Sequence, residues 1–449
     1  MAISNKLVAF AILLLFLAVV VSCDKDSKKK KEKDHKIKEK GEEKSAPEEE
    51  NEEEKKDDGK ENPAPGGEAA ALPATSGSIP VSPGSRGKVF NVLDFGVKTG
   101  ANTDNAVNFI KAWRAACDNP EKSTLLFPKG EFHATAAVFQ GPCKAPIDVE
   151  IQGTILAGSD ISSYSEDFWL SFEKIIGLNV SGNGIIDGQG PNVWKFKEQG
   201  ASMFPISLKF IGCEKITISG LTSINPMGFH FSIVHCDDVT ATNIHLSAPE
   251  DSPNTDGVHI SQSTNVRVFD SHVATGDDCV GVIHGSSDVV VRGVYCGPGH
   301  GLSIGSLGKY DDEKLLKNVL IENCTMNSTD NGARIKTYAG SLPSVAQNIT
   351  FKDITMTNVS NPILIDQSYG KKSKEPSKVQ ISNAQFINIK GTTPTDNAVD
   401  IQCSKAVPCQ GIRLSSINLE YIGAKKKPFV SNCTNAKITY DGPQTPPPC

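Results

Sequence analysis

From residue 149 onward, the 449-residue chain contains short strand-like phrases that recur at similar intervals. Each phrase alternates apolar with polar residues before a turn-forming Asn, Gly or Ser, as expected of a strand with one buried face. The phrases begin at Val149, Leu178, Ile216, Val239, Val266, Val289, Val319, Ile349, Val379 and Ile412. From Val239 onward the steps are 23 to 33 residues long. A strand repeat of this length predicts a solenoid whose coils stack on one another.

The expected fold class is therefore all-β, a single chain wound into a parallel β-solenoid. Glycine is plentiful at 39 residues and aromatic residues make up only 6%, which favours many short strands over helices. A β-sandwich or propeller is the alternative, but the repeat lengths are irregular and no blade motif is present. Apolar residues at helical spacing predict one short helix within Asn102–Cys117. We expect this helix to cap the N-terminal end of the solenoid.

The first 23 residues have the pattern of a secretory signal peptide. Lys6 precedes an unbroken apolar run from Leu7 to Val21, which ends at the small residue Ser22. The run is short for a membrane span, which needs roughly 20 apolar residues. A membrane anchor and a lipoprotein signal acylated at Cys23 are the alternatives. We expect secretion, with no membrane association after the signal is removed.

Residues 24–85 form a predicted spacer before the folded domain. Residues 24–62 are almost entirely Lys, Glu and Asp, and a stretch rich in Pro, Gly, Ser and Ala follows. Without apolar periodicity the segment cannot bury enough surface to offset the entropy of ordering, so it is predicted to be disordered. A tether to an anionic partner is the alternative. The folded domain is expected over residues 86–449.

Charge and architecture bear on the partners of the chain. Beyond residue 62 there are 32 Lys and Arg against 36 Asp and Glu, a net charge of −4. This balance argues against a nucleic-acid partner. Stacking of the coils on one another should leave the molecule monomeric, with pairing of strand edges at either end as the alternative.

Twelve cysteines in a secreted chain predict disulfide bonds. If Cys23 leaves with the signal peptide, eleven remain and at least one thiol must stay free. Short separations suggest four bridges, although spacing does not determine connectivity: Cys117–Cys143, Cys279–Cys296, Cys403–Cys409 and Cys433–Cys449. Asn-x-Ser/Thr triplets compatible with a secreted glycoprotein lie at Asn179, Asn323, Asn327, Asn348, Asn358 and Asn432.

Polar residues of catalytic types recur at the coil spacing in the middle of the repeat. They lie in the sequences NTDG, GDDC, GHG and RIK and comprise Asp256, Asp277, Asp278, His300, Arg334 and Lys336. Residues one coil apart in a stacked solenoid lie over one another at the strand spacing of roughly 5 Å. Taken singly, each motif has an ordinary explanation as a turn, a calcium loop or a solvent-facing strand. Their succession in register predicts that three acids, an imidazole and two cations converge on one face.

This set of groups fits the cleavage of a glycosidic bond. One carboxylic acid must protonate the leaving oxygen, and a second carboxylate must activate water or attack the sugar. Crowding of carboxylates raises the pKa of one of them, which keeps a proton available. A neighbouring Arg and Lys suit a uronic acid, because a guanidinium binds a carboxylate through two hydrogen bonds. The predicted substrate is an acidic polysaccharide.

The ordered motifs NTDG (254–257), GDDC (276–279), GHG (299–301) and RIK (334–336) resemble those of the polygalacturonases, glycoside hydrolase family 28, which cleave the pectin backbone. The resemblance covers roughly residues 88–449. The sequences CGPGHGLSIGSLGKY and NPILIDQSY are most similar to plant exopolygalacturonases. The resemblance implies a right-handed parallel β-helix in the cell wall that hydrolyses α-1,4-galacturonosyl linkages of polygalacturonate with inversion and exo action. It implies no metal and no cofactor.

The resemblance also implies roles for individual residues. Asp277 would be the general acid, and Asp256 and Asp278 would hold and deprotonate the attacking water. His300 would support the protonation of the acid or contact the substrate. Substrate-binding positions would be Arg334 and Lys336, which bind a galacturonate carboxylate, together with Asn254 and Tyr369.

The chain departs from the family pattern in several respects. Where the family usually has Ser and then Gly after GDDC, this chain has Gly281 and Ile283, which predicts altered packing behind the catalytic residues. Plant relatives commonly have a cysteine directly after the tyrosine that corresponds to Tyr369, whereas this chain continues with GKKSKEPSK, so a disulfide-pinned loop is not expected. The charged spacer is not part of the usual domain. In addition, carboxylates stacked about 5 Å apart would by the general rule indicate retention, whereas the family inverts.

Three functions therefore remain open. We favour an inverting pectin hydrolase with exo action. An endo-acting hydrolase is the alternative within this class. A pectate lyase would use calcium and an arginine base, but its motifs differ from the set found here. A catalytically silent wall protein would only bind pectin through the retained cleft, and Gly281 and Ile283 leave room for that alternative.

Overall fold

The computed structural model describes residues 87–100, 103–197, 204–370, 373–424 and 427–449. The predicted signal peptide and spacer, residues 1–85, lie outside this described part. The chain divides into two units, Met1–Pro80 and Val81–Cys449, and all described residues belong to the second. Among the described residues, no helix is long and apolar enough to cross a membrane.

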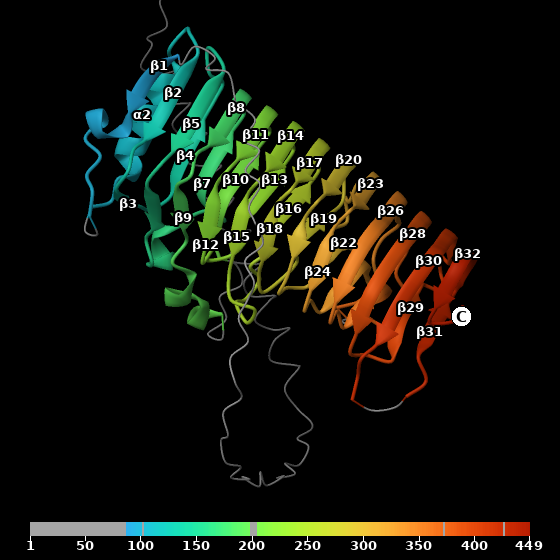
Figure 1. Ribbon diagram of the computed structural model, residues 1–449. Coiled ribbons are helices and arrows are strands. Elements are labelled where there is room, and N and C mark those ends of the chain that lie inside the picture. The colour runs from blue at the N-terminus through green and yellow to red at the C-terminus, as the bar shows by residue number, and fades with distance from the viewer. Residues whose placement is uncertain (1–86, 101–102, 198–203, 371–372, 425–426) are drawn as a thin grey trace, which may run out of the picture. The chain divides into compact units, whose positions relative to one another are not determined.

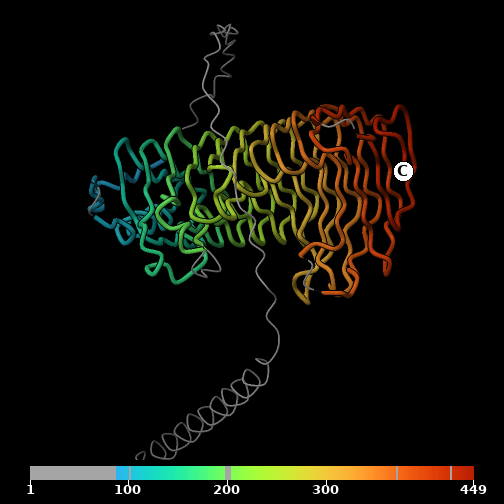
Figure 2. Tube along the Cα trace, turned by 90° about the horizontal axis from the view of Figure 1, so that it is seen from below, coloured from blue at the N-terminus to red at the C-terminus, as the bar shows by residue number. Residues whose placement is uncertain are grey.

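Strands dominate the described residues, and they pair in parallel to form two long sheets (Figure 1). Successive strands of a sheet lie one coil apart along the chain. The tube in Figure 2 shows these coils following one another from the blue N-terminal part of the domain to its red C-terminal end. The domain is a right-handed parallel β-helix, which confirms the predicted fold class.

The ten strand-like phrases of the sequence all form strands of the larger sheet. These strands are β5 (Ile147–Ile151), β8 (Ile176–Ser181), β11 (Glu214–Ser219), β14 (Asp237–Thr242), β17 (Thr264–Phe269), β20 (Ser287–Arg292), β23 (Leu316–Glu322), β26 (Ser344–Thr357), β28 (Val379–Thr393) and β30 (Cys409–Tyr421). Val239 of β14 pairs with Val266 of β17, and Val268 pairs with Val291 of β20. All four side chains are fully buried. The apolar half of the alternation is therefore the inner face of the β-helix.

A stack of turns explains the Asn, Asp and Gly residues within the phrases. In successive coils the turn position has φ of 71° at Gly220, 50° at Asn243, 45° at Asp270, 69° at Gly293 and 52° at Asn323. This left-handed region is open to Gly, and Asn and Asp enter it more readily than other residues. Each such residue ends one strand, such as β14, and lets the chain bend into the next short one, such as β15 (His245–Ser247).

The smaller sheet carries the residues of catalytic type. Its strands are β4 (Ala137–Gln140), β7 (Phe168–Glu173), β10 (Ile206–Ile211), β13 (Phe231–Val234), β16 (Val258–Ser261), β19 (Val280–Val282), β22 (Leu302–Leu307), β25 (Asn331–Tyr338), β27 (Asn361–Tyr369), β29 (Asn397–Gln402) and β31 (Val430–Thr434). His259 of β16, Gly281 of β19, Ser303 of β22 and Arg334 of β25 lie side by side in register. The register between β22 and β25 is regular as far as Ile304 and shifts after it.

The helix α2 (Ala106–Cys117) falls within the range predicted for a helix and lies at the N-terminal end of the domain (Figure 1). Its Trp113 side chain is fully buried and packs against Phe139 of β4 and Phe172 of β7, with ring centroids 5.4 and 5.9 Å away. Phe172 stacks in turn on Phe210 of β10 at 5.4 Å. The helix therefore joins the aromatic part of the core to the first coils.

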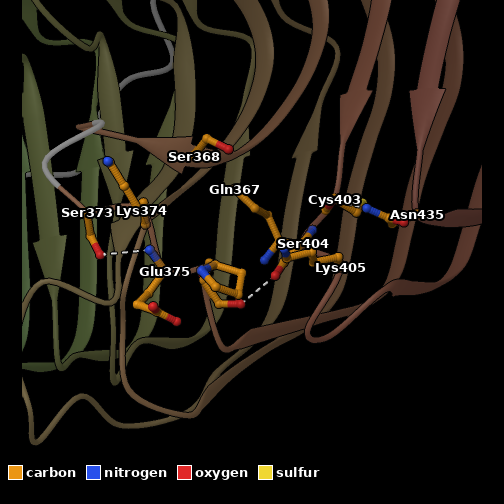
Figure 3. A pocket seen from close by; sticks show the side chains of 12 residues that line it. Gln367, Ser368, Ser373, Lys374, Glu375, Cys403, Ser404, Lys405 and Asn435 are labelled. Atoms are coloured by element: carbon orange, nitrogen blue, oxygen red, sulfur yellow. Dashed lines mark hydrogen bonds between the residues drawn. The ribbon is translucent and has the colours of Figure 1, made fainter.

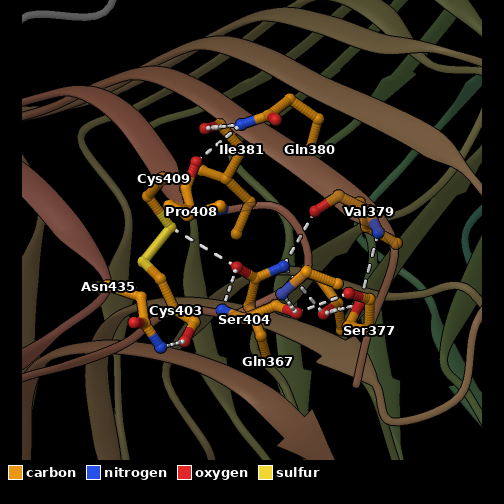
Figure 4. The surroundings of a disulfide bond; sticks show 12 residues. Gln367, Ser377, Val379, Gln380, Ile381, Cys403, Ser404, Pro408, Cys409 and Asn435 are labelled. Atoms are coloured by element: carbon orange, nitrogen blue, oxygen red, sulfur yellow. Dashed lines mark hydrogen bonds between the residues drawn. A yellow bond between two sulfur atoms is a disulfide. The ribbon is translucent and has the colours of Figure 1, made fainter. Parts of the chain in front are cut away.

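All four predicted disulfide bonds are present: Cys117–Cys143, Cys279–Cys296, Cys403–Cys409 and Cys433–Cys449. The Cys403–Cys409 bond closes the turn that follows β29, and Gln367 lies beside it (Figure 4). Among the described residues Cys213, Cys236 and Cys324 remain free and buried. The expectation of at least one free thiol is met within this part of the chain.

Candidate active site

The predicted catalytic residues lie two or three residues before the starts of three consecutive strands of the smaller sheet. Asp256 precedes β16, Asp277 and Asp278 precede β19, and His300 precedes β22. Because the first residues of these strands pair in register, Asp256, Asp278 and His300 occupy equivalent positions in three successive coils. The spacing of the motifs along the sequence is therefore the length of one coil.

Asp256, Asp277 and Asp278 border a cleft of about 500 Å³ over the smaller sheet. Six of the eight predicted site residues line it: Asn254, Asp256, Asp277, Asp278, Lys336 and Tyr369. The other two contact lining residues, because His300 binds Asp277 and Arg334 binds Asp278. The structure thus brings all eight predicted positions to one cleft.

Asp277 and His300 form a hydrogen-bonded pair. Nδ1 of His300 lies 2.9 Å from Oδ1 of Asp277, and the backbone N–H of Asp278 donates to the same oxygen at 2.8 Å. Burial alone would raise the pKa of Asp277, but the hydrogen bond with His300 and the charges of His300 and Lys336 hold that pKa below its ordinary value. The same hydrogen bond raises the pKa of His300. Both shifts favour a proton on the His300 imidazole over a proton on the Asp277 carboxylate.

Asp278 lies at the centre of a buried network of positive groups. Arg334 donates to Oδ1 of Asp278, and Lys336 donates to Oδ2 at 2.7 Å. Ser303 donates to Oδ1 at 2.7 Å and accepts a hydrogen bond from Nε of Arg334 at 2.9 Å. The side chains of Asp278, Arg334 and Lys336 are only 3%, 10% and 7% exposed. Such buried charges require close pairing, so both cations expected to bind substrate already bind a carboxylate of the protein.

Asp256 is the carboxyl with the raised pKa. Burial raises the pKa of Asp256 to about 6, the charges of Asp277 and Asp278 add to the rise, and His259 opposes it. Nδ1 of His259 lies 3.7 Å from Oδ2 of Asp256, and its ring stacks on Phe229 with centroids 4.7 Å apart. One carboxyl pKa is therefore raised, mainly by burial and in smaller part by crowding, but it is that of Asp256 and not that of the residue that the resemblance makes the acid.

The charges at this site oppose a metal ion. Asp277, Asp278 and His300 each offer one ligand atom, and these atoms lie within 4.8 Å of one another. However, Arg334 and Lys336 already bring two positive charges to Asp278. A cation placed there would be repelled by both, so we assign no metal to the cleft.

Comparison with known proteins identifies the family. The profile of the glycosyl hydrolases family 28 matches residues 117–441. The chain belongs to this family. An exopolygalacturonase of Arabidopsis thaliana is 43% identical over 373 residues, which cover 80% of this chain and 88% of the relative. An exopolygalacturonase of Platanus acerifolia is 41% identical over 371 residues, which cover 81% of this chain and 98% of the relative.

Solved structures with the same fold include other glycosyl hydrolases. The endo-xylogalacturonan hydrolase of Aspergillus tubingensis matches with a TM-score of 0.69 at 26% identity, over 78% of this chain and 99% of the other. A hyperthermoactive exopolygalacturonase of Thermotoga maritima matches with a TM-score of 0.66 at 20% identity, over 79% of this chain and 90% of the other. The fold of this family 28 chain is thus the one its sequence predicts.

The two unusual residues after GDDC alter the surface of the cleft. A Cβ atom added at Gly281 would lie 3.6 Å from Oδ2 of Asp256, 3.6 Å from Nδ1 of His259 and 3.7 Å from Oδ2 of Asp278, which are ordinary contact distances. Gly281 therefore leaves the space between the two carboxylates without a side chain. Ile283 lines the cleft and adds apolar surface to it.

A second hollow, of about 290 Å³, lies beside the ends of β27, β29 and β31 (Figure 3). Its buried polar groups are paired within the protein: Gln367 donates to the carbonyl of Val379 at 2.8 Å, and Ser404 donates through Oγ to the carbonyl of Ser377 at 2.6 Å. Glu375 is the one carboxyl residue among those that line it. A single carboxyl does not supply the acid and base of a glycosidase, so this family 28 protein has its candidate active site in the larger cleft.

Sequence reasoning missed three residues that support the catalytic groups. His259 faces Asp256, Ser303 links Asp278 to Arg334, and Asp330 lies 3.4 Å from Nε2 of His300. Positions 259, 281 and 303 are one coil apart, so the register of the strands could have identified the first two. No comparable sequence signal indicates Asp330 in this family 28 chain.

Proposed function

We propose that this protein is a secreted polygalacturonase that hydrolyses the α-1,4-galacturonosyl linkages of polygalacturonate with inversion, acting from a chain end. The observation that carries the proposal is the convergence of three carboxyl groups, an imidazole and two cations on one cleft. The names of the plant relatives support exo action. The predicted signal peptide supports secretion, with the spacer of residues 24–85 preceding the catalytic domain.

In this proposal, Asp277 delivers the proton to the leaving oxygen. The raised pKa of His300 keeps a proton within 2.9 Å of the Asp277 carboxylate. As the glycosidic oxygen approaches, the loss of water around the pair favours the neutral carboxylic acid over the carboxylate. His300 thus stores the proton, and Asp277 is the group that contacts the substrate and donates the proton to it.

Asp256 and Asp278 would hold the attacking water. The gap above Gly281 lies between their Oδ2 atoms and offers the water two acceptors. Arg334 and Lys336 pair directly with the Asp278 carboxylate and hold it in place. Asp256, whose pKa burial raises to about 6, serves as the general base.

Lys336 and Tyr369 form the part of the cleft suited to a uronate. Nζ of Lys336 lies 5.2 Å from the centroid of the Tyr369 ring, and both residues line the cleft. Lys336 keeps donors beyond the one it gives to Asp278, because an ammonium group carries three. A galacturonate carboxylate can therefore bind Lys336 without displacing Asp278, while the buried Arg334 acts mainly on Asp278.

The test is to incubate the purified full-length protein with de-esterified polygalacturonate and to analyse the products by chromatography and by absorbance for unsaturated ends. Saturated monogalacturonate is the expected first product, and NMR of its anomeric proton should show inversion. Longer saturated oligomers would make the enzyme endo-acting. Unsaturated ends would indicate a lyase, and binding without any product would leave a silent pectin-binding protein.

The rate of hydrolysis should follow a bell-shaped pH profile. The value of kcat/KM should rise with pH through about 6, because Asp256 must lose its proton before it can accept one from water. It should fall again above the ordinary pKa of histidine, since the raised pKa of His300 marks where its pair with Asp277 loses the shared proton. Initial rates on trigalacturonate from about pH 4 to pH 9 would measure both limbs. A profile that declines through pH 6 would contradict the role of Asp256.

A further inference from the structure

A second set of cleft residues lies after the strands that follow the catalytic residues. β19 follows Asp278 and is followed by His284, while β22 follows His300 and is followed by Lys309 and Tyr310. His284, Lys309 and Tyr310 all line the same cleft as the carboxyl groups. They therefore form a part of its wall at the opposite ends of the strands.

Lys309 and Tyr310 are held in a defined conformation by Glu313. The Glu313 carboxylate accepts hydrogen bonds from the backbone N–H groups of Gly308, Lys309 and Tyr310, at 2.6, 2.8 and 3.2 Å. Below this turn the ring of His284, a residue only 6% exposed, packs against the Tyr310 ring with centroids 5.9 Å apart. The turn is thus braced from both sides, which reduces the entropy that a ligand must remove on binding.

The side chains that this turn presents to the cleft are available to a ligand. Tyr310 is 50% exposed. Of the three other lysines that line the cleft, two are engaged, since Lys209 binds Asp167 at 2.6 Å and Lys336 binds Asp278. Lys309 has no acidic partner among the described residues, and its Nζ lies 5.2 Å from the centroid of the Tyr310 ring.

We propose that Lys309 and Tyr310 form a subsite for a galacturonate unit of the bound chain, at the ends of the strands opposite the catalytic carboxyl groups. A sugar ring has an apolar face that can pack on an exposed aromatic ring, and each galacturonate carries one carboxylate that an unpaired ammonium group can bind. His284 is a positioning residue that supports the tyrosine. The inference rests on the proposed function, because it takes polygalacturonate as the ligand.

The test measures ligand affinity in the full-length Asp277→Asn protein, so that the ligand is not consumed during the measurement. Calorimetry would compare trigalacturonate with its fully methyl-esterified form. Lys309→Gln should weaken binding of the acid about fivefold and leave binding of the ester unchanged, because the ester carries no charge. Tyr310→Ala should weaken binding of both ligands about tenfold. This difference in pattern would not arise from a merely structural effect.

Matched controls come from exposed residues outside the cleft. Lys437→Gln on β32 (Ala436–Thr445) and Ile422→Ala, at a residue 48% exposed, should leave both affinities unchanged. The subsite is overturned if the Lys309 and Tyr310 variants bind like these controls, or if Lys309→Gln weakens both ligands equally. An absence of trigalacturonate binding to the parent protein would overturn it as well. If binding follows the expected pattern but the wild-type protein releases no product, the subsite stands and the proposed hydrolase activity fails.

Discussion

Asp277→Asn is expected to lower kcat on polygalacturonate by about a hundredfold to ten-thousandfold, the range typical of a lost general acid. An amide cannot give the leaving oxygen a proton. Its Oδ1 atom can still accept hydrogen bonds from His300 and from the backbone N–H of Asp278. The fold and the affinity for oligogalacturonate should therefore persist, which steady-state rates and calorimetry on the same preparation would check.

The matched control for this variant is Asp288→Asn. Asp288 lies in β20, accepts a hydrogen bond from Asn318 at 2.9 Å and is exposed outside the cleft. Its replacement should leave kcat within a factor of about two, because surface substitutions away from special features have small effects. An Asp277→Asn protein that keeps more than about a tenth of the wild-type kcat would place the acid on another residue.

Asp278→Asn should cause the largest loss of stability, about 3–5 kcal/mol, together with loss of activity. The variant leaves Arg334 and Lys336 buried without the carboxylate that both now bind. The cost comes from the uncompensated charges rather than from lost packing, since Asn has nearly the same shape as Asp. Urea unfolding followed by circular dichroism would measure the shift of the midpoint.

A surface ion pair offers the control for Asp278→Asn. Asp238 and Arg267 lie 2.9 Å apart with side chains 48% and 40% exposed, so Asp238→Asn should cost only about 0–1 kcal/mol. Adding Lys336→Met to Asp278→Asn should recover part of the lost stability, because it removes one of the unpaired cations. Equal midpoints for the Asp278 and Asp238 variants would mean that the buried network does not stabilise the fold.

The β-helix could be predicted because the sequence pattern that indicates it lies within single strands. The alternation of apolar and polar residues in a phrase such as that of β17 follows from one buried face, and the same alternation recurs wherever a coil adds a strand. Asp256, Asp278 and His300 were placed together for a related reason. In a stack with regular register, equal steps along the chain mean adjacency in space.

The electrostatics of the site could not be read in the same way. The i, i+2 spacing of Arg334 and Lys336 indicates that both point to one face, but it does not identify what they meet there. The structure places both on Asp278. Likewise, the sequence indicates that carboxyl groups are crowded, whereas only their burial and partners decide that Asp256, and not Asp277, has the raised pKa.

The pairing of β22 with β25 is in regular register as far as Ile304 and shifts after it, which has a consequence for evolution. Backbone hydrogen bonds between neighbouring coils determine the spacing of the residues that perform the chemistry, because these residues precede or lie within the regular part of each strand. The segments after it, such as the one that carries Lys309 and Tyr310, can gain or lose residues without changing that spacing. Selectivity for a substrate can therefore change by insertions in these segments. The capacity to cleave the substrate changes independently, by point substitution of the catalytic residues.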